Sequence, residues 1–343
     1  MLKIFPNTKI YLLCPSDYIT GGVECLHQVS DKLIKLGFDA RIFYIPKITE
    51  NALPQYKNYK IVKDSKIEDK KENILIIPEV WIDKLKEFKK IRKSIFWMSI
   101  DNVKKNTTLP IGKINKKFPW LKKRFPKIYD LLKKIYLKIN KKGKILFDFK
   151  ENKNIYHFAQ SYYAKDFLLK KGVKKVYILS DYLNKNHFKK RNLNKKENIV
   201  VYNPKKGKEI TKELIKKSPE IKYVPLQNMT AKEVADTISK SKVYIDFGTH
   251  PGKDRLPREA IINGCCVIVG KRGSAKFYED IPIKKEYKFD IKNLNLNKII
   301  KKIKECLKNY NKKIKDFKNY KKFVENDERQ FELEIKRIFS VKK

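Results

Sequence analysis

Thirty residues at 246–275, DFGTHPGKDRLPREAIINGCCVIVGKRGSA, combine glycine with fixed positive charge. They hold five of the twelve glycines of the chain, interleaved with the basic residues Lys253, Arg255, Arg258, Lys271 and Arg272. Glycine lets the backbone approach a ligand closely, and Lys and Arg neutralise negative charge. The stretch therefore indicates an anion that is held partly by backbone N–H groups.

A helix is predicted inside this stretch. Asp254 is placed to cap it, Pro257 falls in its first turn and Gly264 lies just past its end. A helix N-terminus offers unpaired N–H groups and a partial positive charge, so it suits a phosphate or diphosphate. The basic side chains around this N-terminus are Lys253, Arg255 and Arg258.

Glu259 lies about one turn into the same helix. Its carboxylate could accept hydrogen bonds from hydroxyls beside the phosphate, such as those of a ribose. Gly252 and His250 belong to the loop before the helix, GTHPGK. The imidazole of His250 either hydrogen-bonds a sugar or phosphate or stabilises the loop.

Two further strand ends carry similar residues. NPKKGK follows the strand NIVVYNP and brings Lys205 and Lys206, and GKRGSA follows CCVIVG and brings Gly273 and Ser274. Because ligands of parallel α/β sheets bind beyond the carboxyl ends of the strands, we expect all three loops to meet at one crevice. An ordinary turn is the alternative for each loop taken singly.

Several common motifs are missing from the sequence. It contains no G-x-G-x-x-G and no D-x-D, and Gly252-Lys253 is followed by Asp254 where a P-loop needs Ser or Thr. The five cysteines form no CxxC pair, so metal and disulfide interpretations are weak. We therefore expect that no metal is bound and that protein cations neutralise the anion instead.

Composition bounds the class of protein. The chain has 343 residues, enough for two domains, and a formal net charge of +44. Such charge implies contact with phosphates or with an anionic membrane surface, or it belongs to a merely lysine-rich surface. The sequence has no apolar run of membrane-spanning length and no signal-peptide pattern at its start, which predicts a cytoplasmic protein.

Short apolar runs alternate with amphipathic stretches along the chain, which predicts an α/β fold with parallel sheets. We expect a first domain at 1–190 and a second at 191–343 that ends in a helical tail. A basic insert at about 113–144 carries an apolar stripe at helical spacing. That stripe either lies in a membrane interface or packs on the protein's own core.

Three segments together resemble bacterial glycosyltransferases of the GT-B architecture, which include the family 4 enzymes. They are SDYITGGVECLHQVSDKLIKLG, YNPKKG and YIDFGTHPGKDRLPREAIINGCCVIVG, and the similarity extends over roughly 9–290. The resemblance implies two Rossmann-like domains that face a cleft. The C-terminal domain would bind a nucleotide-sugar and the N-terminal domain mostly the acceptor.

The resemblance also assigns roles to residues. Lys206 would contact the donor diphosphate, Glu259 the nucleotide ribose, and the Gly21-Gly22 loop the transferred sugar or its phosphate. Family 4 enzymes carry another glutamate eight positions before the one that corresponds to Glu259, and this chain has Pro251 at that position. The stereochemical outcome and the donor are therefore left open, and Lys253 or Arg255 is an alternative ligand of the diphosphate.

An inverting enzyme needs a base on the acceptor side of the cleft. The sequence offers Asp17 in the loop after the first strand, Glu24 at the start of the first helix and Asp101 after the strand SIFWMS. The loop PSDYITGG favours Asp17, with a turn-forming role as its alternative.

The sequence thus predicts a metal-independent glycosyltransferase without a cofactor beyond its nucleotide-sugar donor. It would act at the inner face of the cell membrane on a lipid-linked or surface-glycan acceptor. One alternative is a nucleic-acid-binding protein, which the diffuse charge and the missing recognition motifs disfavour. Another is an epimerase or an inactive scaffold with the same fold.

Overall fold

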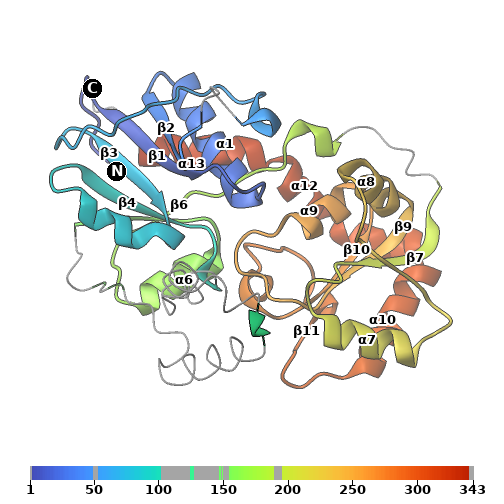
Figure 1. The fold of residues 1–343 in the computed structure, drawn as a ribbon. Coiled ribbons are helices and arrows are strands. Elements are labelled where there is room, and N and C mark those ends of the chain that lie inside the picture. Colours follow the sequence, from blue (N-terminus) through green and yellow to red (C-terminus); the bar gives the residue numbers. More distant parts are fainter. Residues whose placement is uncertain are drawn as a thin grey trace.

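The computed structural model describes residues 2–48, 53–101, 124–126, 147, 149, 154–188 and 195–339. Apart from 124–126, the predicted basic insert lies outside these residues, and so does the predicted domain boundary near 190. The described chain forms two parallel α/β units that lie next to each other (Figure 1).

The first unit contains a six-stranded parallel sheet in the order β2-β1-β3-β4-β5-β6. Its strands are β1 (Lys9–Pro15), β2 (Asp39–Ile45), β3 (Ile74–Pro78), β4 (Arg92–Trp97), β5 (Tyr156–Ala159) and β6 (Val176–Ile178). Register pairs Ile10 of β1 with Ala40 of β2 and with Ile74 of β3. The apolar runs of the sequence are these strands because both faces of the sheet are covered.

Two helices of the first unit begin where their side chains predict. Helix α1 (Gly21–Lys35) starts at Thr20, whose hydroxyl accepts the N–H of Val23, and Gly37 follows its end at φ +87°. Helix α6 (Tyr162–Lys170) starts at Ser161 in the same way. Positive φ favours glycine after a helix, which confirms the predicted end of the first helix.

The second unit contains a five-stranded parallel sheet in the order β11-β10-β9-β7-β8. Its strands are β7 (Glu197–Tyr202), β8 (Lys222–Pro225), β9 (Ser241–Asp246), β10 (Cys266–Gly270) and β11 (Lys288–Phe289). The helices between them are α7 (Lys208–Lys217), α8 (Ala231–Lys240) and α9 (Arg255–Ile262). Thr230 and Glu233 form the capping box that the sequence predicts at the start of α8.

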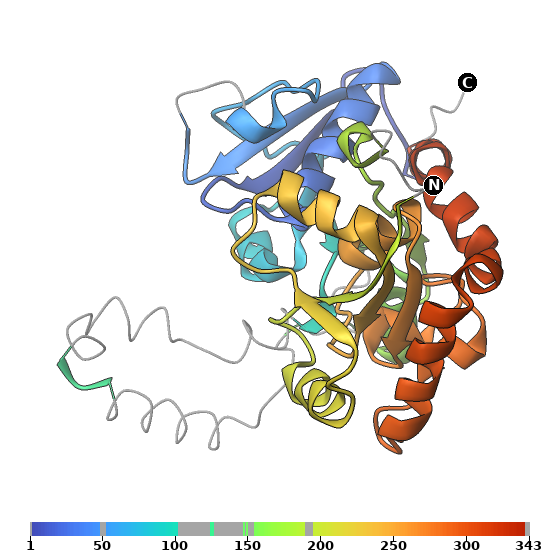
Figure 2. The same ribbon diagram turned by 90° about the vertical axis from the view of Figure 1, so that its right-hand side faces the viewer.

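The C-terminal helices connect the second unit back to the first. They are α10 (Leu296–Lys308), α11 (Tyr310–Lys313), α12 (Lys318–Glu325) and α13 (Asp327–Ile338), and Figure 2 shows them in orange to red along one side of the molecule. Phe331 and Ile335 of α13 are buried in the core of the first unit, beside strand and α1 residues. The chain therefore passes from the first unit to the second between β6 and β7, which is the first crossing. It returns to the first unit at the start of α13, which is the second crossing.

The core of the first unit divides between the two faces of its sheet. Ile10 and Leu12 of β1 pack toward α1 and α13, whereas Tyr11 and Leu13 pack toward α6. This alternation follows from the two-residue period of a strand. No described helix is both long and apolar enough to cross a membrane.

Candidate active site

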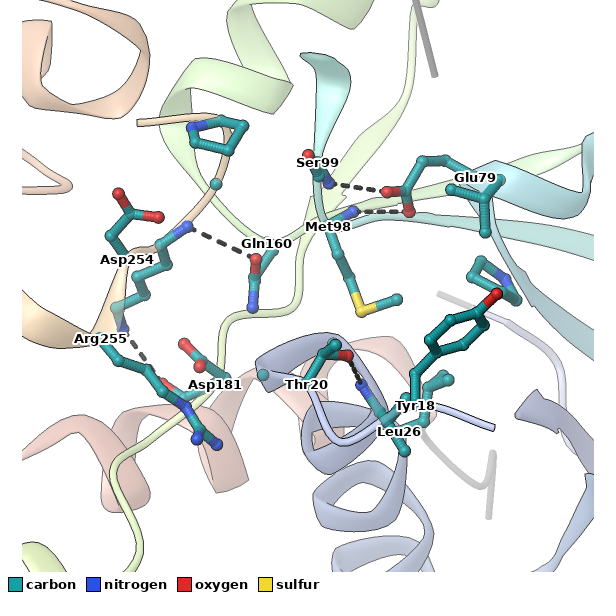
Figure 3. Close-up of a pocket in the computed structure, with 18 of the residues that line it drawn as sticks. Tyr18, Thr20, Leu26, Glu79, Met98, Ser99, Gln160, Asp181, Asp254 and Arg255 are labelled. Carbon is teal, nitrogen blue, oxygen red and sulfur yellow. Dashed lines mark hydrogen bonds between the residues drawn. The ribbon is translucent and has the colours of Figure 1, made fainter. Parts of the chain in front are cut away.

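A cavity of about 580 Å³ lies between the two units (Figure 3). The first unit contributes residues that follow β1, β3, β4 and β5, and the second contributes residues that follow β7 and β9. Its wall includes Tyr18, Thr20, Gly21, Gly22, Glu79, Met98, Gln160, Asp181, Asn203, Lys206, Gly252, Lys253, Asp254 and Arg255. The cavity thus lies at the carboxyl edges of both sheets, as parallel α/β sheets predict.

The three predicted loops of the second unit pack directly against one another. Gly207, at φ +62°, has no space for a side chain because a Cβ would overlap the backbone of Phe247 and Gly248. Gly273, at φ +51°, lies in the same way against the carbonyl of His250. Ser274 joins the loops further, since its N–H donates to His250 O at 2.8 Å and its hydroxyl to Gly252 O at 2.7 Å. Gly207 and Gly273 therefore allow these loops to pack closely against one another. Gly273 and Ser274 do not line the cavity.

Lys206 places an ammonium group in the cavity wall. Its Nζ lies 2.7 Å from Asp254 Oδ2, and its side chain is 30% exposed. Asp254 occupies the N-cap position of α9 but makes no side-chain cap bond. The predicted capping carboxylate is instead the partner of Lys206. Lys205, its neighbour in sequence, is exposed and lies outside the wall.

His250 is fully buried behind this pair. Its Nδ1 lies 2.9 Å from Asp254 Oδ2, and its Nε2 lies 3.7 Å from Asp246 Oδ1. Burial lowers the pKa of this imidazole, but the two carboxylates outweigh burial and leave the pKa above its ordinary value. Because His250 does not line the cavity, its contacts support the loop-stabilising alternative.

Asp246, His250 and Asp254 also form a group whose ligand atoms all lie within 4.8 Å of one another. Such a group could hold a cation. The ammonium of Lys206 already supplies positive charge to Asp254, and Asp246 accepts hydrogen bonds from Tyr244 Oη and Gly248 N, each at 2.9 Å. Metal independence stays a prediction.

Lys253 and Arg258 contact carboxylates of the chain. Lys253 Nζ lies 2.8 Å from Asp327 Oδ1, while the Arg258 guanidinium lies 2.9 Å from Asp181 Oδ2 and 3.3 Å from Asp327 Oδ2. All four side chains are buried. Asp181 belongs to the first crossing between the units and Asp327 to the second. Two of the three cations that the sequence places near a phosphate thus bind both crossings to the second unit.

Arg255 lines the cavity and forms an ion pair with Glu24 of α1, across the two units. Glu24 also accepts hydrogen bonds from Tyr59 Oη at 2.7 Å and Asn184 Nδ2 at 2.8 Å. Its carboxylate therefore has three donors around it, and it does not line the cavity. These contacts give Glu24 a role in holding Arg255, and its role as a base stays a prediction.

The other predicted residues are distributed unevenly. Gly21 and Gly22 begin α1 at the cavity wall, where a Cβ would lie 3.4 Å from Arg255 Nε and 3.5 Å from Met98 Sδ respectively. Asp17 is exposed and outside the wall, and Asp101 accepts a hydrogen bond from Tyr163 Oη at 3.2 Å. Glu259 lies 3.5 Å from His187 Nδ1 and also outside the wall.

Glu79 is a cavity residue that was not predicted from the sequence. It follows β3, is 3% exposed, and its carboxylate accepts the N–H groups of Met98 at 3.0 Å and Ser99 at 2.9 Å (Figure 3). Burial raises the pKa of the Glu79 carboxyl to about 7, although these N–H groups act to lower it. Its position directly after the strand ILIIP was the available signal, because strand ends supply the residues of such sites.

Known structures share this arrangement. A glycosyltransferase from Rickettsia africae superposes with a TM-score of 0.62 at 15% identity, covering 98% of this chain and 100% of its own. Sucrose-phosphate synthase from Thermosynechococcus elongatus gives 0.60 at 12% identity, covering 97% and 98%. Anabaena HepE, solved in complex with UDP-glucose, gives 0.58 at 12% identity, covering 96% and 98%.

The chain therefore has the GT-B fold of glycosyltransferases, as the sequence resemblance implies. No protein-family model and no curated protein sequence matches it.

Proposed function

We propose that this protein is a glycosyltransferase that uses a nucleotide-sugar donor. The observation that carries the proposal is the Lys206 ammonium in the wall of the cavity between the two units, at the carboxyl end of β7. Arg255 and the start of α9 lie on the same side of the cavity. Positive side chains beside a helix N-terminus suit a diphosphate, and the neighbouring structures include one solved with UDP-glucose.

The remaining roles follow from position. The absence of side chains at Gly21 and Gly22 keeps space beside Arg255 and Met98 for the transferred sugar. Glu259 would meet the ribose, as the resemblance implies. If the transfer inverts, Glu79 is the base that we propose, since a carboxyl with a pKa of about 7 in the cavity wall can take a proton from an acceptor hydroxyl near neutral pH.

The acceptor that we propose is a lipid-linked or surface glycan at the cytoplasmic membrane face. This part rests on the net charge of +44 and on the basic insert at 113–144, which lies outside the described residues. Clustered Lys and Arg are attracted to anionic lipids. We propose further that the enzyme needs no metal and no cofactor beyond the donor, because protein cations stand where the diphosphate would bind.

A thermal-shift panel tests the donor site. UDP, GDP, ADP, CMP and dTDP are compared with and without EDTA, at a salt concentration that suppresses nonspecific phosphate binding. We expect one nucleotide to raise the melting temperature whether or not EDTA is present. In Lys206→Ala the affinity for it should fall about tenfold or more, because a charge-assisted hydrogen bond is lost. Lys205→Ala removes a neighbouring exposed charge and should leave the affinity unchanged.

Other outcomes point elsewhere. A shift that EDTA abolishes would instead favour a cation at Asp246, His250 and Asp254. Stabilisation by oligonucleotides without any nucleotide response would favour the nucleic-acid alternative. If a nucleotide binds but no sugar is transferred to any acceptor, the epimerase or scaffold alternative gains support.

A further inference from the structure

A second cavity, of about 750 Å³, lies behind the first. Gln160 and Lys253 line both cavities and so form part of the wall between them, where Lys253 N donates to Gln160 Oε1 at 3.4 Å. Lining residues of the second cavity come from α6, from 278–282 of the second unit and from α13. The second cavity therefore depends on both units and on the helix that returns the chain to the first.

One contact between the units shapes this cavity. The carboxylate of Asp280 accepts the N–H groups of Tyr162 at 2.8 Å and Tyr163 at 3.0 Å, at the start of α6. The rings of Tyr163 and Phe277 lie 6.3 Å apart beside it. These contacts join two segments that each contribute a tyrosine to the cavity wall, Tyr162 from α6 and Tyr278 from the second unit.

Both tyrosines are exposed to solvent. Tyr278 is 58% exposed and Tyr162 is 37% exposed. A tyrosine offers a flat apolar face together with a hydroxyl that can donate and accept. Two exposed rings at one cavity therefore suit a ligand that has both apolar faces and many hydroxyls.

The charges that line this cavity are nearly balanced, as they are in the first. Four carboxylates and three cations line it, a balance opposite in sign to the net charge of +44 of the whole chain. Asp327 already contacts Lys253 at 2.8 Å, and Glu334 accepts the N–H of Ser180 at 2.7 Å. Burial and the carboxylates Glu279, Glu334 and Asp280 also raise the pKa of Tyr162. The wall thus offers an anion no excess of positive charge, and the N–H groups at the start of α6 are already bonded to Asp280, which disfavours a phosphate, an anionic lipid or a nucleic acid.

Hydrogen-bonding side chains complete the wall. The amide side chains of Gln160, Asn326 and Gln330 line the cavity, and each amide group can donate and accept. Gln330 is exposed on α13, with its Nε2 3.1 Å from Glu334 Oε1. The volume falls within the range of small-molecule sites. Such a wall matches a neutral ligand with hydroxyl groups along its length.

We infer that this second cavity binds an uncharged oligosaccharide, apart from the proposed transfer site. Tyr278 and Tyr162 contact sugar faces, and Gln330 and Glu279 hydrogen-bond sugar hydroxyls. Because the wall comes from both units, a bound saccharide bridges them. The site does not require the transfer reaction, so it stands independently of the proposed function.

A glycan array of neutral bacterial oligosaccharides tests this site, with the full-length protein at high salt so that charge alone does not retain it. The wild-type protein is expected to bind at least one saccharide. Tyr278→Ala and Gln330→Ala should each weaken that binding about tenfold, as for removal of a central contact. Tyr278→Phe, which keeps the ring, should weaken it less than Tyr278→Ala. The matched control is Leu333→Ala, an exposed position of α13 outside the cavity.

Two results would overturn the inference. One is a wild-type protein that binds no neutral saccharide. The other is saccharide binding that Tyr278→Ala leaves intact but that UDP or Lys206→Ala abolishes, because the sugar would then occupy the first cavity. Melting temperatures of all variants with and without nucleotide exclude misfolding. Saccharide binding without any nucleotide response would leave this site standing while the proposed transferase fails.

Discussion

The basic residues of one short motif, KDRLPR at 253–258, have two different environments. Arg255 stands in the cavity wall with Lys206 nearby in the same wall, and each contacts a carboxylate while keeping 30% of its side chain exposed. Lys253 and Arg258 are buried against Asp181 and Asp327 at the two chain crossings. The role of each cation therefore depends on which carboxylates the fold brings to it. Partly exposed cations can exchange a carboxylate for a ligand, whereas buried ones cannot do so without opening the structure.

The largest expected effect comes from the buried side of this comparison. Arg258→Met leaves Asp181 and Asp327 without the guanidinium in a buried site, so we expect a loss of about 3–5 kcal/mol in the free energy of unfolding. Denaturant titration followed by circular dichroism measures it. Unchanged stability together with lost nucleotide binding would show instead that Arg258 binds the nucleotide. The distinction between buried structural cations and cavity cations would then be wrong.

An intermediate effect concerns Glu79, a carboxyl of the cavity wall whose pKa of about 7 lies above the ordinary value of 4.5. Its protonated form is the one that folding favours. Its contribution to stability is therefore fully present below pH 4.5 and is lost as the pH rises through 7. Between pH 4.5 and 8 the wild-type protein should lose up to about 3 kcal/mol more stability than Glu79→Gln.

Denaturant titrations of both proteins across this pH range measure the difference. Because both proteins share every other titratable group, the pH dependence that those groups cause cancels in that difference. Parallel curves would mean that Glu79 titrates normally and that the cavity is well hydrated. The proposal of Glu79 as a base near neutral pH would then lose its physical support.

The smallest effect concerns the exposed side. Glu24→Gln removes the negative partner of Arg255 but keeps an amide oxygen for Tyr59 and Asn184. A partly exposed ion pair contributes about 0.2–1 kcal/mol, so freeing Arg255 should raise nucleotide affinity by up to about fivefold. Calorimetric titration of the nucleotide identified by the thermal-shift panel measures it. A large fall in affinity would show that Glu24 positions Arg255 for the ligand and does not compete with it.

Much of the fold could be predicted from local signals. The apolar runs predicted parallel strands, Thr230 with Glu233 predicted the start of α8, and Gly37 predicted the end of α1. These features depend on neighbours within a few residues, so the sequence contains the whole cause. The convergence of the three glycine-containing loops was also predictable, because carboxyl ends of parallel strands share an edge.

The partners of the site residues were not predictable in the same way. Asp254 looked like a helix cap, yet its carboxylate contacts Lys206 across 48 residues of sequence. Glu79 gave no stronger signal than other acidic residues, and its raised pKa comes from burial between elements that are distant in sequence. Such contacts follow from how loops pack, and a residue type reveals only that some partner is needed.

Two parallel α/β units and an edge with glycines and cations could be predicted from the sequence, because hydrophobic periodicity, helix caps and the alternation of strands and helices along the chain are local properties. Only the packing of distant segments settles which cations stay partly exposed in the cavity wall and which are buried against Asp181 and Asp327. The physical reason is burial. Asp327, at the start of the helix that packs onto the first unit, contacts both Lys253 and Arg258, and these buried ion pairs engage the two cations within the protein.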